Sequence, residues 1–158
     1  MSGIEYELAG LLKKKGLTLG TVESATGGLI AHLVTNVPGS SDYFKGSVTA
    51  YANETKINIA GVKPATLKEH GAVSPQTAEE MAAGGREVLK VDICVSDTGI
   101  AGPSGATPGK PVGLFYIGLA HKNGVFSRKL QLKGTREAIK SSAAQAALEW
   151  VREYLERY

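Results

Sequence analysis

Three short segments of small and polar residues carry the chemistry that this sequence can perform. They are residues 23–28 (Glu-Ser-Ala-Thr-Gly-Gly), 51–56 (Tyr-Ala-Asn-Glu-Thr-Lys) and 97–103 (Asp-Thr-Gly-Ile-Ala-Gly-Pro). Each follows an apolar or β-prone run, and the first two precede a predicted helix. In α/β proteins, such strand ends gather free backbone N–H groups and bind ligands. The segments therefore predict a hydroxyl nucleophile, a lysine base and a glycine-lined pocket.

Ser24 is the candidate nucleophile. A serine between a strand and a helix directs its hydroxyl toward the free N–H groups of the helix, and Gly27 and Gly28 let a ligand approach that backbone closely. Such donors hold a developing oxyanion without reorganising. The alternative is that Ser24 or Thr26 only caps the helix. Position alone favours the capping interpretation.

Lys56 is the candidate base. If Asn53 caps its helix, Lys56 lies in the first turn, where the helix dipole disfavours a cation and partial burial would lower its pKa. Tyr51 could orient Lys56 or relay a proton, although a strand tyrosine is more often a packing residue. The histidines are poorer bases, because they fall in a helix, before a turn glycine and in a hairpin: His32, His70 and His121. A Ser-His-Asp triad is therefore disfavoured.

The third segment opens a stretch, residues 98–113, that is too rich in glycine and proline to form a helix. It exposes backbone donors and suits either a phosphate or ribose cradle or a plain structural loop. It matches neither the P-loop nor the dinucleotide-binding fingerprint. No cluster of His, Cys and carboxylate residues has ligand spacing, so no metal site is expected.

The elements around these segments alternate between helical and strand patterns, which predicts an α/β fold: a three-layer α/β/α sandwich with a mixed sheet. Helices are expected from residue 4 to near Gly16, from Thr26 to Pro38, from Asn53 to Gly61, from Ser74-Pro75 to Leu89, and from Thr135 to the end. Strands are expected over residues 17–22, 47–51, 91–96, 112–120 and 125–132, the last two joined by an Asn-Gly turn. The Gly84-Gly85 pair marks a weak point or a close packing contact.

Length and composition predict one ordinary globular domain over residues 1–158, with 42% hydrophobic and 21% charged residues. The net charge of +3 is mild, and its dispersed basic residues indicate a solvated face rather than a nucleic-acid surface. The single cysteine, Cys94, lies in an apolar run and is expected to be buried. With no signal-peptide pattern and no apolar stretch of bilayer length, a cytoplasmic protein without membrane contact is expected.

The three segments, in this order, resemble the CinA C-terminal domain family, whose characterised members are nicotinamide-nucleotide amidases. Six motifs carry the resemblance, at residues 23–28, 38–41, 51–56, 71–74, 98–103 and 110–113. Ala25 departs from the cysteine that the family often has, and Ala52 from its usual serine. Activities of the extra N-terminal domain in some larger members are not expected of this chain.

The resemblance implies an amidohydrolase that converts nicotinamide mononucleotide to nicotinate mononucleotide and ammonia through a Ser/Lys acyl-enzyme. The implied catalytic residues are Ser24, Lys56 and Tyr51, with neither metal nor cofactor. The implied substrate-binding residues are Thr26, Gly27, Gly28, Asn53, Thr98, Gly99, Ala101, Gly102 and Arg136. Arg136 and Lys110 are the candidates for the nucleotide's phosphate.

The expected partners are a small-molecule nucleotide substrate and further copies of the chain, in a homo-oligomer; nucleic acid and membranes are not expected. Two alternatives stay open. One is a catalytically inactive nucleotide-binding paralogue, and the other is a hydrolase of a different small amide with the same Ser/Lys pair.

Overall fold

Five strands form one mixed sheet in the order β2-β1-β3-β4-β5 in the computed structural model, which describes residues 3–158. The strands are β1 (Leu19–Glu23), β2 (Phe44–Thr49), β3 (Ile93–Gly99), β4 (Leu114–His121) and β5 (Gly124–Gln131). β1 pairs in parallel with β2 and β3. β4 pairs antiparallel with β3, and β5 pairs antiparallel with β4. The carboxyl ends of β1, β2 and β3 therefore meet at one edge of the sheet. The strand order reverses there around β1, and open α/β sheets bind ligands at such a point.

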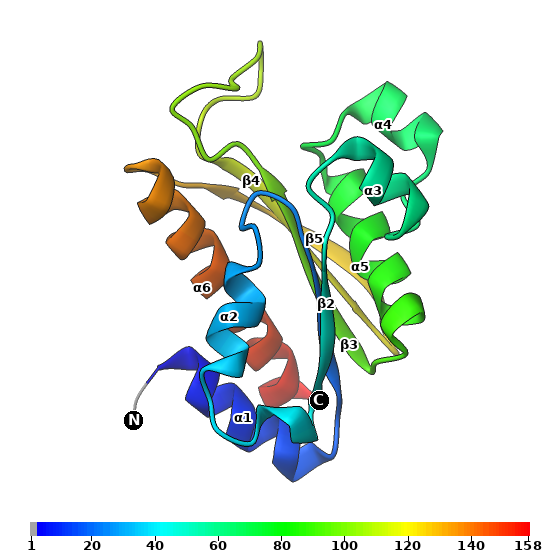
Figure 1. The fold of residues 1–158 in the computed structure, drawn as a ribbon, viewed down its shortest axis with the longest axis vertical. Helices are drawn as coiled ribbons and strands as arrows, with labels where there is room; N and C mark the ends of the chain where they lie inside the picture. Colours follow the sequence, from blue (N-terminus) through cyan, green and yellow to red (C-terminus); the bar gives the residue numbers. More distant parts are fainter. Residues whose placement is uncertain (1–2) are drawn as a thin grey trace.

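Helices cover both faces of the sheet, which confirms the predicted three-layer α/β arrangement. They are α1 (Ile4–Lys15), α2 (Leu29–Thr35), α3 (Asn53–Asn58), α4 (Pro64–His70), α5 (Pro75–Leu89) and α6 (Arg136–Arg157), with a 3₁₀ turn η1 (Ser40–Asp42). Figure 1 shows α1, α2 and α6 on one side of the sheet and α3, α4 and α5 on the other. The larger apolar core lies beneath α1, α2 and α6, with Leu12, Ile30 and Leu148 fully buried in it.

Two predicted helix starts are confirmed, and a side chain caps each of them. The Ser74 hydroxyl accepts a hydrogen bond from the Thr77 amide at 3.1 Å at the start of α5, and Thr135 caps α6 in the same way. Two other predicted caps are wrong. α2 begins after Gly28 instead of being capped by Thr26, and α3 begins after Ala52 with no side-chain cap.

Helix α4 was not predicted from the sequence. It has only seven residues, and its one buried side chain is the polar Thr66. A helix without an apolar stripe leaves no periodic pattern, although Pro64 occupies a favourable position in its first turn.

Helix α5 packs closely on two neighbours through the Gly84-Gly85 pair, Gly84 on the segment after α3 and Gly85 on the sheet, so the predicted close contact is confirmed. A Cβ on Gly84 would lie 1.7 Å from the Ala60 carbonyl oxygen, and one on Gly85 would lie 2.2 Å from Cγ2 of Val22. Cys94 is fully buried on the face of the sheet that α5 covers, and burial raises the pKa of its thiol to about 12. Among residues 3–158, none of the helices combines the length and apolarity needed to cross a bilayer.

Gly84→Ala is expected to destabilise the protein, because the new methyl group meets backbone that cannot rotate away. Overpacking of this kind costs about 1–3 kcal/mol, more than the gain of ~0.5–1 kcal/mol that alanine brings to a helix. Gly10→Ala in α1 is the matched control, since nothing lies within 4 Å of its added Cβ. Urea unfolding should move the midpoint down for the first variant and slightly up for the second. Equal midpoints would contradict the contact.

Candidate active site

Ser24 and Lys56 reach the same edge of the sheet from neighbouring parallel strands. Ser24 directly follows β1, and Lys56 lies in α3, which follows β2. Ala50 connects them: its amide donates to the Glu23 carbonyl at 2.7 Å, and its carbonyl accepts from Lys56 Nζ at 2.9 Å. Ala50 therefore links the backbone before Ser24 to the Lys56 amine, whereas none of the hydrogen bonds within residues 3–158 joins Ser24 Oγ to Lys56 Nζ.

The Lys56 side chain is buried, with only 2% of its surface exposed. Its Nζ donates to two main-chain carbonyls, Ala50 O at 2.9 Å and Tyr51 O at 3.1 Å. Burial lowers the pKa of this amine, and the negative charge of Asp97 opposes that effect in part. An uncharged amine has two N–H groups and one lone pair, so these two carbonyls use both donors and leave the lone pair for a proton.

Ser24 itself lies in a turn that β3 holds in place. Its side chain is 7% exposed, and its amide donates to Asp97 Oδ2 at 3.2 Å. The Thr26 amide donates to Asp97 Oδ1 at 3.1 Å. Within residues 3–158, the Ser24 hydroxyl takes part in none of the hydrogen bonds, so the predicted cap through Ser24 is also absent.

Two buried carboxylates stabilise the turn and the helix that follows it. Glu23 accepts hydrogen bonds from the amides of Gly28, Ile30 and Ala31 at 2.8–3.1 Å. It thereby satisfies free N–H groups at the start of α2, as a capping side chain does. The Thr26 hydroxyl bonds to Glu23 Oε1 at 2.7 Å and also to Asp97 Oδ2. Thr26 therefore connects the two carboxyl groups, in place of the capping role predicted for it.

The two glycines of the turn have positive φ angles, +62° at Gly27 and +102° at Gly28, which explains why glycine occupies both positions. Their amides are already engaged: Gly27 N donates to Ser24 O at 3.0 Å, and Gly28 N donates to Glu23 Oε1 at 3.1 Å. The predicted oxyanion role of these amides would require breaking those bonds. The amide of Ala25 is in none of the hydrogen bonds described for residues 3–158, so it is a better placed donor.

Arg136, at the start of α6, contacts two of the other predicted residues. Its Nη1 donates to the Gly102 carbonyl at 2.8 Å, and its Nη2 lies 3.1 Å from the Tyr51 hydroxyl. Tyr51 is 60% exposed and contacts Lys56 through its backbone carbonyl, not through its ring. Its phenol is thus placed on Arg136, and no contact supports the predicted proton relay to Lys56.

Four of the remaining predicted residues have structural explanations, whereas Asn53 does not. The Thr98 hydroxyl donates to Ala72 O at 2.7 Å, and Ala101 is buried against the start of α6. A Cβ on Gly99 would lie 2.3 Å from the Phe115 ring, and one on Gly102 would lie 2.5 Å from Val112. Asn53 is exposed, and no hydrogen bond described for residues 3–158 involves its side chain.

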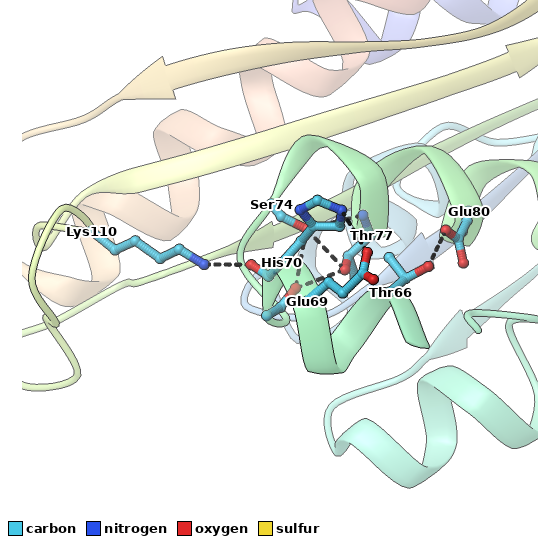
Figure 2. A network of polar contacts seen from close by, with 8 residues as sticks. Thr66, Glu69, His70, Ser74, Thr77, Glu80 and Lys110 are labelled. Atoms are coloured by element: carbon cyan, nitrogen blue, oxygen red, sulfur yellow. Dashed lines mark hydrogen bonds and ion pairs between the residues drawn. The ribbon is translucent and has the colours of Figure 1, made fainter. Parts of the chain in front are cut away.

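Lys110 anchors the glycine-rich loop to the end of α4. Its Nζ donates to the His70 carbonyl at 2.7 Å at the end of α4, as Figure 2 shows beside the Ser74–Thr77 pair that begins α5. A lysine near a helix C-terminus is favourably placed for the carbonyls there. This contact gives Lys110 a structural role and lends no support to the phosphate contact predicted for it.

Two cavities lie away from the candidate site. One of about 860 Å³ is lined by His121, Phe126 and Trp150, and one of about 450 Å³ by Arg86, Lys90 and Val125. Both lie near the β4–β5 turn, at the opposite edge of the sheet from Ser24, because β4 runs antiparallel to β3. Over residues 3–158, no group of His, Cys, Asp and Glu side chains could hold a metal ion.

Sequence reasoning missed three charged residues of the site. Glu23 and Asp97 are fully buried, and Lys140 Nζ lies 3.7 Å from the position that a Cβ on Gly27 would occupy. A charged residue at the end of an apolar strand was the available signal for the first two. Lys140 follows Arg136 by one helical turn, so both cations project from one face of α6.

Known proteins are similar to this chain in sequence and in fold. A family profile described as the CinA C-terminal domain matches residues 1–155. A relative from Caldanaerobacter subterraneus subsp. tengcongensis, a competence-damage inducible protein by name, is 51% identical over 146 residues, covering 92% of this chain but 35% of its own length. A CinA-like protein from Kosmotoga olearia is 49% identical over 96% of this chain and 37% of its own. The chain thus spans about a third of these relatives.

Solved structures match over nearly the whole chain. The competence/damage inducible protein CihA from Agrobacterium tumefaciens is similar with a TM-score of 0.90 and 35% identity, covering 99% of both chains. A CinA superfamily protein from Klebsiella pneumoniae 700603 has a TM-score of 0.94 and 27% identity, covering 98% of this chain and 97% of its own.

Proposed function

This chain belongs to the CinA C-terminal domain family, and we propose that it is an amidohydrolase that converts nicotinamide mononucleotide to nicotinate mononucleotide and ammonia. The observation that carries the proposal is Lys56, a buried amine whose two donor contacts are main-chain carbonyls. Burial lowers the pKa of this amine, so its free form is available at lower pH than that of a solvated lysine. Ser24, which follows the Glu23 carbonyl bonded by Ala50, supplies the hydroxyl.

In the proposed reaction, the Lys56 amine takes the proton of the Ser24 hydroxyl as the serine oxygen attacks the carboxamide carbon. The tetrahedral intermediate collapses as Lys56 returns the proton to the leaving nitrogen, which departs as ammonia. Water then attacks the acyl-enzyme ester, again giving its proton to Lys56. The ester bond breaks, Ser24 regains its proton, and the product is the carboxylic acid.

The oxyanion of the tetrahedral intermediate needs donors that are free in the resting protein. The Ala25 amide fits this requirement, since it follows the nucleophile and has no acceptor among residues 3–158. The positively charged Lys140, beside Gly27, favours negative charge at the same turn. These two groups take the place of the Gly27 and Gly28 amides.

The direct test is release of ammonia from nicotinamide mononucleotide by the purified protein without added metal. Nicotinate mononucleotide, which has no amide, is the control and should release none. Tight binding in calorimetry without turnover would favour the inactive nucleotide-binding paralogue. Turnover of other small amides in preference to the mononucleotide would favour the hydrolase of different specificity.

Arg136→Ala is expected to raise the KM for nicotinamide mononucleotide about 10–100-fold, the loss of one charge-assisted contact to the phosphate. A purely structural Arg136, which only ties Gly102 to Tyr51, would affect all substrates equally. The corresponding riboside, which lacks the phosphate, distinguishes these roles. Its kcat/KM should change little in Arg136→Ala, and an equal loss for both substrates would contradict phosphate binding.

Tyr51→Phe is the matched control, because it removes the hydroxyl at 3.1 Å from Arg136 while leaving the guanidinium in place. Its KM should rise by far less than that of Arg136→Ala.

A further inference from the structure

Asp97 is a buried acid whose contacts all lie on the turn that carries Ser24. It comes from β3, which is more than 70 residues away in the sequence, and its side chain is fully buried. Its two carboxyl oxygens accept hydrogen bonds from the backbone amides of Ser24, at 3.2 Å, and Thr26, at 3.1 Å. One carboxyl group therefore orients the peptide units on both sides of the candidate nucleophile.

The hydrogen-bond count around Thr26 requires one more proton than the hydroxyl supplies. Thr26 Oγ1 contacts both Glu23 Oε1, at 2.7 Å, and Asp97 Oδ2. A hydroxyl has a single proton, so it can donate to only one carboxylate, and the other contact needs a proton on the acid. Glu23 already accepts three backbone amides, from Gly28, Ile30 and Ala31. The extra proton is therefore best placed on Asp97, which then donates to Thr26.

The charge of Asp97 also acts on the candidate base. The negative charge of Asp97 opposes the effect of burial on the pKa of Lys56, and the charge of Glu23 raises the pKa of Asp97. An ionised Asp97 favours the ammonium form of Lys56, whereas a neutral Asp97 favours the free amine.

We propose that Asp97 is a positioning residue that holds the Ser24 turn through its hydrogen bonds and, through its own protonation, sets the fraction of Lys56 present as the free amine. The role of Lys56 as a base rests on the proposed function. The burial of Asp97 agrees with this assignment, since it raises the pKa of that carboxyl from 3.8 to about 6.

Asp97→Asn tests the proposal, because an amide has the shape of the neutral acid, keeps one acceptor oxygen for a backbone amide and carries no charge. NMR titration of side-chain-labelled lysine should place the pKa of Lys56 at least about 0.5 unit lower in this variant than in the unmodified protein. The rising limb of the pH profile of kcat/KM should move to lower pH by the same amount. Asp97→Ala should lose at least about 10-fold in kcat/KM at every pH, because the turn loses its acceptor.

Asp92→Asn is the matched control, because Asp92 also accepts a backbone amide, that of Thr18 at 2.8 Å, but at the opposite edge of the sheet. It should leave the Lys56 titration unchanged. An unchanged Lys56 titration in Asp97→Asn would overturn the proposal. The NMR measurement needs no turnover, so a shifted titration in a protein that releases no ammonia would support the coupling and count against the amidase alone.

A measurement on the unmodified protein completes the test if Asp97→Asn does not fold. Direct ¹³C titration of the Asp97 carboxyl in the unmodified protein should give a value near 6, and a value at or below 3.8 would also overturn the proposal.

Discussion

Ser24→Ala is expected to lower kcat for ammonia release by at least about 10³-fold, because the variant has no oxygen to form the acyl-enzyme. Its stability should stay within about 0.5 kcal/mol of the unmodified protein. The Ser24 hydroxyl makes no hydrogen bond within residues 3–158, and the contact from its amide to Asp97 is kept in the variant. Ammonia assays and urea unfolding on the same preparation measure both quantities.

Thr18→Ala should give the opposite pattern and serves as the control. The Thr18 hydroxyl donates to Asp92 at 3.0 Å and accepts from the Asp92 amide at 2.9 Å, at the edge of the sheet away from Ser24. Losing these bonds should cost ~1–2 kcal/mol of stability and leave turnover intact. If Ser24→Ala instead lost stability and kept its activity, Ser24 would be a structural residue and the proposed reaction would be wrong.

The sequence predicted the elements that position the site because strand ends and helix starts depend on residues that are close together in the sequence. Apolar runs before Ser24 and Asp97, and Ser74-Pro75 at the start of α5, indicate their structures without tertiary information. Parallel pairing of β1 with its neighbours then brings those ends together. The family's motif pattern pointed to the same residues.

The contacts that define the chemistry were beyond such reasoning. Lys56 is oriented by main-chain carbonyls, which every residue has, so no side-chain pattern signals them. Arg136 meets Tyr51 across 85 positions of the chain, and Thr26 bonds to Asp97 across 71. Thr26 could cap a helix locally, but its hydroxyl instead bonds to an acid that is distant in the sequence, Asp97. Local propensity cannot rank these alternatives, because tertiary packing decides between them.

Lys56→Met is expected to lower kcat for ammonia release by at least about 10³-fold, since the variant keeps an unbranched side chain but has no proton acceptor. Lys56→Arg separates a base from a mere positive charge. A guanidinium offers donors to the Ala50 and Tyr51 carbonyls but does not deprotonate in proteins. It should be as inactive as the methionine variant. If Lys56→Arg retained more than about a tenth of the activity, Lys56 would act through its charge and not as a base.

The pH dependence of the unmodified protein provides an independent check on Lys56. Burial lowers the pKa of Lys56 in the folded state below the ordinary lysine value of 10.5. The free amine therefore forms, and turnover should rise, at a pH below that value. In this window the unfolded chain binds more protons than the folded one, so stability should also increase as pH rises toward 10.5. Lys56→Met should lose this stabilising slope together with its activity. A slope that persists in Lys56→Met would mean that another group titrates there, and the assignment of the base would fail.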